Sequence, residues 1–249
     1  MFHYKDILNR LRPPRKKPRV WLLEDEKIGY IRLRKVASSS INRCLTQHIL
    51  NKTGQQDAVI NWALIKKIEE KYSSHIEHTA IRKQLKGEYF LFAFVRNPVE
   101  RAWSCYKNKI LNTNRANKKD ILANKQFYFD MDFTEFVDVL AKLPDNVIDR
   151  HLRSQSWFLK DEQGLLPDYI GKLETFDADW EVISSKYGLP KPVHHNKTDD
   201  SSKITDICSR TSMEQLIDRY SDDINLFGYQ STMDNMLKEY KTGTISNHE

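Results

Sequence analysis

Residues 89–106 read YFLFAFVRNPVERAWSCY, and they give the clearest indication of the fold in the chain. Its first part, Tyr89–Val95, is a continuous apolar run, which is typical of a central parallel strand covered on both faces. Pro98 suits the first turn of a helix. The segment after it places apolar side chains along one helical face, namely Ala102, Trp103, Tyr106 and Ile110. The stretch therefore predicts a buried strand followed closely by a helix.

The same order of strand, loop and helix is predicted upstream. Val20–Leu23 and Ile28–Val36 are short apolar or alternating runs separated by an acidic segment, which predicts a hairpin or strand pair. Ala37–Ser40 is small and polar, and from Ile41 onward apolar side chains recur at helical spacing. The sequence thus predicts a second strand that leads through a tight polar loop into a helix.

Segments of helical and strand pattern alternate along the rest of the chain. A strand is predicted within 169–176, and helices are predicted at Trp62–Tyr72, Phe133–Leu140, Asp179–Tyr187 and Ser212–Tyr220, the last with Thr211 or Ser212 as its N-cap. Alternating strands and helices are typical of α/β proteins. We therefore expect an α/β three-layer sandwich with a central, mainly parallel sheet.

Composition bounds the class of protein. The chain has 249 residues, of which 39% are hydrophobic and 30% charged, so it can bury the core of one globular domain. No apolar run is long enough to span a bilayer, and the start lacks the apolar region of a secretory signal. The three cysteines, Cys44, Cys105 and Cys208, form no CxxC pair, which favours a reducing compartment and argues against a zinc site. A cytoplasmic location is expected.

Basic residues are concentrated at the start of the chain. The first twenty residues hold seven Lys and Arg against one acid, which leaves 33 of each sign in the remainder. The run RPPRKKPR at 12–19 could contact nucleic acid or an anionic membrane surface, but we favour a solvated, proline-stiffened arm that makes at most peripheral membrane contact. We therefore divide the chain into a basic arm at 1–19, a domain at 20–230 and a tail at 231–249.

The loop between the second predicted strand and its helix is the first candidate anion site. It consists of Arg34, Lys35, Val36, Ala37, Ser38, Ser39 and Ser40. In open α/β sheets ligands bind at the carboxyl ends of the strands, and helix N-termini offer free N–H groups to anions. A lysine before small hydroxyl residues that open a helix is the layout of a phosphate cradle. It is not a Walker A loop, because GxxxxGK[ST] is absent. Taken alone the signal is weak, since serines are ordinary N-caps.

Residues 89–106 also contain the second candidate anion site. Arg96 ends the strand and Ser104 lies about two turns into the helix, so a guanidinium and a hydroxyl can converge on one phosphate. Taken alone, Arg96–Pro98 could also be an ordinary strand end followed by a helix-starting proline, with Arg101 as a salt-bridging surface residue. The two candidate sites are persuasive together because both fall on strand-to-helix junctions.

These segments resemble a known enzyme family. RKVASSSI at 34–41 and FVRNPVERAWSCYKNK at 94–109 are similar to the two cofactor motifs of sulfotransferases that use 3′-phosphoadenosine 5′-phosphosulfate (PAPS), in the branch that modifies carbohydrates. The resemblance continues through 149–159, 169–189 and 220–229. Ser39 stands where threonine is frequent and Asn97 where aspartate is frequent. The branch's usual amino-terminal membrane anchor is missing, which is compatible with a bacterial source.

The resemblance implies a P-loop-like sulfotransferase fold, a PAPS donor and a sugar hydroxyl or amine as acceptor. Lys35 and Ser38–Ser40 would hold the 5′-phosphosulfate, with Lys35 also neutralising the leaving oxygen, and Arg96 and Ser104 would hold the 3′-phosphate. Sulfuryl transfer should be an in-line displacement in which positioning and charge stabilisation dominate. No metal is expected, and the sequence shows no obvious metal cluster.

The acceptor's proton requires a general base. His75 and His78 lie in the region where related enzymes place a histidine base, and on a helix their spacing would put both on one side. His151 and Glu174 are rivals, and His194 and His195 are weaker candidates. We rank the histidines His78, His75, His151, although an isolated histidine is more often structural.

The acceptor site and three rival functions stay open at this stage. Basic residues after the second motif either line a groove for an anionic polysaccharide or form a solvated face: Lys107, Lys109, Arg115, Lys118, Lys119 and Lys125. A P-loop kinase is the first rival, and it is disfavoured because GK[ST] and a Walker B acid are missing. The second rival is a nucleic-acid binder that uses the basic arm, which is not expected. The third rival is a protein that binds PAPS or its product without turnover. The oligomeric state cannot be read from the sequence.

Overall fold

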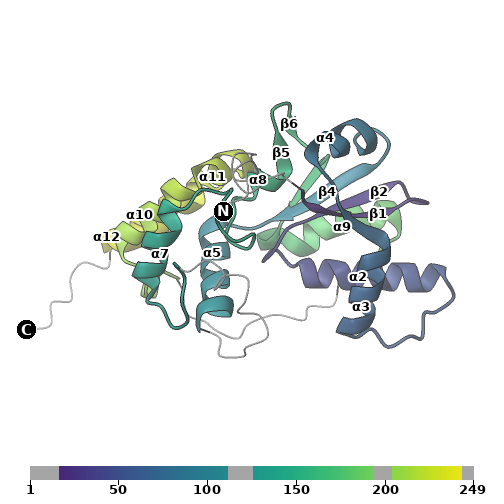
Figure 1. Ribbon diagram of the computed structural model, residues 1–249, viewed down its shortest axis with the longest axis horizontal. Helices are drawn as coiled ribbons and strands as arrows, with labels where there is room; N and C mark the ends of the chain where they lie inside the picture. Colours follow the sequence, from purple (N-terminus) through teal and green to yellow (C-terminus); the bar gives the residue numbers. More distant parts are fainter. Residues whose placement is uncertain (1–16, 112–125, 193–203, 243–249) are drawn as a thin grey trace, which may run out of the picture.

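A five-stranded sheet organises the molecule in the computed structural model, which describes residues 17–111, 126–192 and 204–242 (Figure 1). The strand order is β3-β1-β2-β4-β7. Strand β1 runs antiparallel to both β2 and β3, while β2, β4 and β7 are parallel neighbours. Four of the five strands therefore point the same way, and the expected mainly parallel sheet is confirmed. The strands are β1 (Arg19–Leu23), β2 (Ile28–Arg32), β3 (Ser73–His75), β4 (Phe90–Val95) and β7 (Tyr169–Lys172).

The predicted apolar runs form the centre of this sheet. Every residue of β2 is buried, and so is every residue of β4 except Phe90. The predicted hairpin is confirmed in the antiparallel register that pairs Arg19 with Arg32 and Leu23 with Ile28. On one face of the sheet the Tyr30 ring stacks on Phe92 at 5.1 Å between ring centroids. Apolar strands buried on both faces are what a covered parallel sheet requires.

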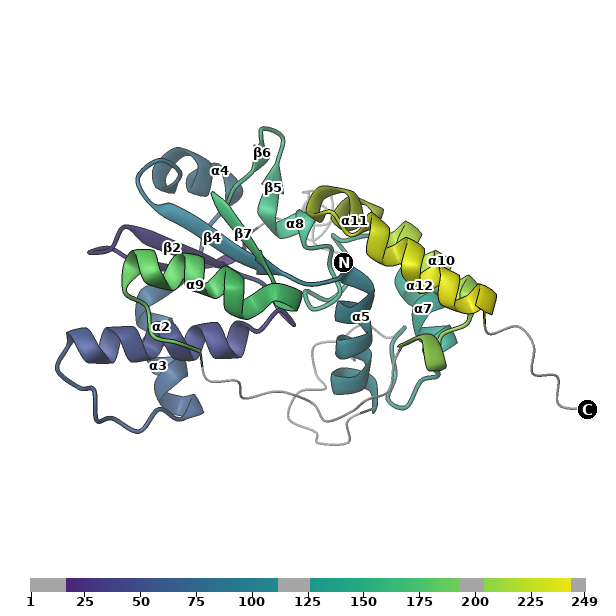
Figure 2. The ribbon, with the colours of Figure 1, turned by 180° about the vertical axis from the view of Figure 1, so that it is seen from behind.

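Two further layers cover the sheet, and they lie on opposite sides of it in both ribbon views (Figures 1 and 2). One contains α2 (Ser38–Lys52), α3 (Trp62–Tyr72) and α9 (Phe176–Tyr187). The other contains α4 (His78–Ala80), the π-helix η1 (Ile81–Leu85) and a small hairpin of β5 (Lys160–Asp161) and β6 (Gly164–Leu165). The three-layer arrangement is therefore confirmed.

A group of helices lies beyond the carboxyl ends of β2, β4 and β7 (Figure 1). It comprises α5 (Pro98–Tyr106), the π-helix η2 (Lys107–Leu111), α7 (Phe133–Lys142), α8 (Ser156–Leu159), α10 (Arg210–Arg219), α11 (Ser221–Phe227) and α12 (Gln230–Thr242). Short 3-10 turns at η4 (Leu173–Thr175) and η5 (Ile204–Asp206) complete the described chain. None of the described helices combines the length and apolar character needed to cross a bilayer.

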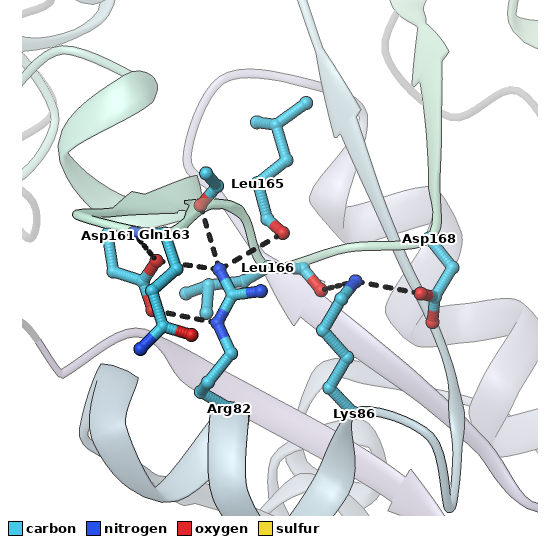
Figure 3. A network of polar contacts seen from close by, with 8 residues as sticks. Arg82, Lys86, Asp161, Gln163, Leu165, Leu166 and Asp168 are labelled. Carbon is cyan, nitrogen blue, oxygen red and sulfur yellow. Dashed lines mark hydrogen bonds and ion pairs between the residues drawn. The ribbon is translucent and has the colours of Figure 1, made fainter.

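A polar network ties η1 to the β5–β6 hairpin (Figure 3). Arg82 forms a two-point ion pair with Asp161 at 2.9 and 2.6 Å and donates to the Gly164 carbonyl at 2.9 Å. Four residues later, Lys86 donates to Asp168 at 2.8 Å and to the Leu166 carbonyl. These contacts fix the hairpin and the segment entering β7 against η1.

Three local features differ from the sequence-based expectation. Ser73–His75 pairs with Arg19–Trp21 as an edge strand, so His75 and His78 do not share a helical face. The N-cap of α10 is Ser209, whose side chain accepts from the Ser212 amide, and not Thr211 or Ser212. The chain beyond residue 230 begins as α12, whose Met233 is buried. The expected boundaries at 19/20 and 230/231 stay a prediction.

Several expected features lie outside the described residues. They are most of the basic arm, His194, His195, Arg115, Lys118, Lys119 and Lys125.

Candidate active site

The carboxyl ends of three parallel strands meet at one edge of the sheet. Strand β2 ends at Arg32, β4 at Val95 and β7 at Lys172, and each leads through a short connection toward a helix. Ligands of open α/β sheets bind at such an edge. The residues of both predicted anion sites follow two of these strand ends.

The loop Leu33–Ala37 has a backbone suited to an anion. Leu33 and Val36 are fully buried and anchor it in the core. Lys35 (φ 68°) and Ala37 (φ 59°) are left-handed, whereas Val36 between them is not. Alternation of left-handed and other backbone conformations turns successive N–H groups toward one side, where they can bind an anion. Non-glycine residues with a left-handed backbone are strained and occur frequently at functional sites. Helix α2 then begins without a side-chain cap or an acidic residue in its first turn, so its N–H groups also face the loop.

The side chains of Arg34 and Lys35 are half-buried, and neither has a hydrogen bond or ion pair with any residue that the structure describes. Burial, together with repulsion from Lys109, Arg96 and Arg101, lowers the pKa of Lys35 to about 8. Burial and neighbouring arginines likewise lower the pKa of Arg34 to about 10. Cations held close together against their own repulsion indicate a site built for an anion.

The backbone of Arg96 is clamped at the end of β4. Its N–H donates to Gln155 Oε1 at 3.0 Å, and its carbonyl accepts from Gln155 Nε2 at 2.8 Å. Gln155 is itself fixed by Asp223, whose carboxylate accepts from the backbone N–H of Gln155 at 2.7 Å. Both Gln155 and Asp223 are completely buried. The start of the second motif is thus held by a carboxylate 127 residues along the chain.

Arg96 and Ser104 lie on the same side of α5. The Arg96 Nη2 atom is 3.4 Å from Glu100 Oε2, and Glu100 and Ser104 are four residues apart on the helix. Asn97 caps this helix by accepting from the amides of Val99 and Glu100, and Pro98 occupies its first turn as predicted. A guanidinium and a hydroxyl are therefore presented on one helical face.

Glu174, in η4, connects the second motif to the segment between α11 and α12. Its Oε1 accepts from the backbone N–H of Asn97 at 2.6 Å, and its Oε2 accepts from the Tyr229 hydroxyl at 3.0 Å. Burial and this carboxylate raise the pKa of Tyr229. Because both carboxylate oxygens already accept hydrogen bonds, the geometry gives Glu174 a positioning task.

The two candidate bases His75 and His78 lie in different surroundings. His75 is exposed at the end of β3, with Nδ1 3.1 Å from the Lys17 carbonyl. His78 is buried, and its charge contributes to the lowered pKa of Asp161, after the larger effect of the Arg82 hydrogen bonds. The structure therefore places His78 beside the network of Figure 3.

His151 is buried and oriented by a carboxylate. Its Nδ1 lies 2.6 Å from Asp149 Oδ1, which also accepts from the His151 amide at 2.8 Å. Burial lowers the pKa of His151, and the charges of Lys109 and Arg34 lower it further against the opposing effect of Asp149. A neutral His151 that donates from Nδ1 to Asp149 presents Nε2 as a proton acceptor. The effect of Arg34 places this pair near the Leu33–Ala37 loop.

The family of the chain follows from a profile comparison. The profile described as "Sulfotransferase family" matches residues 18–230, which include both motifs, both strand-to-helix junctions and His151. The chain belongs to the sulfotransferase family. Members of this family are PAPS-dependent transferases, so this sulfotransferase is an enzyme of that class. No curated protein and no solved structure gives a significant match.

The residues present in this sulfotransferase fit the PAPS donor. PAPS carries a 5′-phosphosulfate and a separate 3′-phosphate, so its site needs two anion-binding groups. The Leu33–Ala37 loop brings backbone amides and uncompensated cations to one place, and the junction of β4 with α5 brings Arg96 and Ser104 to another. Within residues 17–111, 126–192 and 204–242, no group of three or more His, Cys, Asp or Glu side chains is arranged to hold a metal ion.

Several contributors to the site were not predicted. The alternative of a surface salt bridge for Arg101 is excluded, because the residue is 1% exposed. Lys109 is also buried and does not line a solvated face, while Lys107 lies 4.9 Å from the centre of the Trp103 ring. Asp149, Gln155 and Asp223 lie in stretches that carried the family resemblance. Only their pairing across the fold shows what they do.

Proposed function

We propose that this sulfotransferase moves a sulfuryl group from PAPS to a hydroxyl of a carbohydrate, with His151 as the general base. The observation that carries the proposal is the group of cations at two adjacent strand ends, whose repulsion adds to burial in lowering the pKa of Lys35. An anionic nucleotide would relieve their mutual repulsion on binding. When bound, PAPS supplies the activated sulfuryl group.

Each group of residues has one task in this proposal. Lys35 and Ser38–Ser40 bind the 5′-phosphosulfate, and Lys35 stabilises the charge that develops on the leaving oxygen. Arg96 and Ser104 bind the 3′-phosphate. Gln155, Asp223 and Glu174 hold the second motif in place through its backbone.

His151 is favoured over the other candidate bases because of its hydrogen bonds. Within the part of the chain that the structure describes, His151 combines a carboxylate on Nδ1 with a lowered pKa and with Arg34 as a neighbour. A base that is neutral near pH 7 and fixed in one tautomer can take the acceptor's proton. His75, His78 and Glu174 remain the other described candidates.

The acceptor class rests on the resemblance of both motifs to carbohydrate-modifying sulfotransferases, and an anionic polysaccharide is the form that a basic site favours. The test measures release of 3′-phosphoadenosine 5′-phosphate (PAP) from PAPS with unsulfated or partly sulfated glycans, with a simple phenol and with a tyrosine peptide. We expect release to depend on a glycan. Equal or faster release with the phenol or the peptide would contradict the carbohydrate assignment.

A matched pair of variants tests the base. Asp149→Asn removes the carboxylate that accepts a hydrogen bond from His151, whereas Arg82→Met removes one partner of a half-buried ion pair with Asp161 and leaves His151 untouched. We expect glycan-dependent turnover to fall in Asp149→Asn and to persist in Arg82→Met. Normal turnover in both His151→Ala and Asp149→Asn would exclude His151 as the base.

A further inference from the structure

A buried arginine joins the two motifs and the segment that carries His151. Arg101 lies in the second turn of α5 and is 1% exposed. Its Nε donates to the Arg34 carbonyl at 3.0 Å, and its Nη1 donates to the Arg153 carbonyl at 2.8 Å. One planar side chain thereby connects α5 to two backbone segments that lie far apart in sequence.

Both carbonyls belong to segments that act in the proposed reaction. The Arg34 carbonyl directly precedes Lys35, whose left-handed backbone shapes the Leu33–Ala37 loop. The Arg153 carbonyl belongs to the 145–155 turn, which carries His151 and is tied internally by the bonds Ser154 N to Asp145 and Arg153 Nε to Ile148. A contact at Arg153 therefore constrains the whole turn.

The Arg101 side chain is kept in place at a cost to the fold. No described carboxylate forms an ion pair with it, and its Nη2 is buried without a hydrogen-bond partner among the described residues. An unsatisfied buried N–H and an unpaired buried cation both destabilise a fold. The positive charge also repels Lys35 and so contributes to the electrostatic field of the site.

We propose that Arg101 is a positioning residue that sets the spacing between the Leu33–Ala37 loop and the 145–155 turn, and hence between Lys35 and His151. This role rests on the proposed function, because the two segments act together only in sulfuryl transfer. An arginine is required, since its rigid fork reaches two carbonyls in different directions and a lysine ammonium is a single point of contact.

The test is calorimetric titration with PAP, together with thermal unfolding, of wild type, Arg101→Lys and Arg101→Met. Arg82→Lys is the matched control, because Arg82 also ties two carbonyls of another segment to its helix, in the network of Figure 3. We expect Arg101→Lys to bind PAP about tenfold more weakly and Arg101→Met more weakly still. We expect Arg82→Lys to stay within about twofold of wild type.

A second measurement separates positioning from a general loss of stability. PAP affinity should fall once pH rises past the pKa of Lys35. In Arg101→Met this fall should begin at a higher pH, because one repelling cation is gone. If Arg101→Met does not fold, the PAP affinity of Arg101→Lys alone tests the role of Arg101.

The outcomes that overturn the proposal are distinct. Wild-type PAP affinity in a folded Arg101→Lys protein would overturn the role of Arg101, and so would an equal loss in Arg82→Lys. A wild-type protein that does not bind PAP would overturn the proposed function and this role with it.

Discussion

At the scale of single residues, Lys35 shows how the site uses unfavourable local structure. Its backbone is left-handed and its ammonium is half-buried among other cations, so its pKa falls to about 8. Both features cost stability and both suit an anion cradle. A residue placed in this way is better explained by ligand binding than by folding.

The lowered pKa of Lys35 predicts a pH dependence of nucleotide binding. Lys35 is a cation below about pH 8 and becomes neutral above it, so the attraction for phosphate is present at pH 7 and lost as pH rises toward 9.5. Titration with PAP from pH 7 to 9.5 should show affinity declining from near pH 8. In Lys35→Met affinity should be low and nearly constant over this range. An identical pH profile in wild type and variant would rule Lys35 out.

The Asp149–His151 pair predicts a loss of turnover without a loss of binding. In Asp149→Asn the amide no longer fixes the histidine tautomer, and the same change in a serine protease lowers kcat by about 10⁴. We expect a fall of about 10²–10⁴ in kcat with unchanged PAP affinity. Because burial lowers the pKa of His151, wild-type activity should persist at pH 6.5 and decline at lower pH. A parallel loss of PAP affinity would indicate damage to the fold instead.

At the scale of elements, β7 shows how close packing delivers Glu174 to the site. Gly171 lies against Phe94, and a Cβ built there would be 2.5 Å from a ring carbon. No ordinary contact is that short, so only glycine lets β7 pair with β4 at this point. The pairing of β7 with β4 places the following turn η4 so that Glu174 accepts from the backbone N–H of Asn97.

Substitution of Gly171 should therefore destabilise the protein through β7. We expect Gly171→Ala to lower the free energy of unfolding by about 1–3 kcal/mol, measured in denaturant. Adding Phe94→Leu should restore part of the loss, because the smaller side chain removes the contact with the ring. If the single variant were as stable as wild type, the close packing would not limit the strand.

The elements that could be predicted from sequence are those with a strong periodic pattern. The apolar run of β4, the β1–β2 hairpin and α2, α3, α5, α7 and α9 were all expected within a few residues. Strand β3 could not be predicted, because Ser73–His75 has no apolar pattern and becomes a strand only by pairing with β1. The two-residue strands β5 and β6 likewise depend on Arg82, which lies on another element.

At the scale of the whole molecule, the site is assembled from contacts that sequence cannot show. The two motifs were identified because their residue order is contiguous and lies at strand ends. Their supports are not contiguous: Arg101 meets Arg34 across 67 residues, and Glu174 meets Asn97 across 77. The sequence therefore identifies the two motifs but not the distant residues that hold them in place.

The helix beyond residue 230 predicts an effect of truncation on the whole fold. In α12 Met233 is buried, the Met236 sulfur lies 3.7 Å from the side-chain Nδ2 of Asn97, and the Tyr240 hydroxyl donates to the Cys208 carbonyl at 2.8 Å. We expect a chain that ends at Tyr229 to unfold at a temperature lower by about 4–8 °C in a calorimetric scan. An unchanged melting temperature would support a dispensable tail at 231–249.

The most direct test of the central claim is calorimetric titration with PAP, with ATP as the control ligand, on wild type and Arg96→Ala. The site should bind PAP in the micromolar range and ATP far more weakly. Arg96→Ala should lose about tenfold or more in PAP affinity, because the charge-assisted hydrogen bonds that we propose for Arg96 and the 3′-phosphate would be lost. Equal affinity of wild type and Arg96→Ala for PAP, or no PAP binding by wild type, would contradict the account.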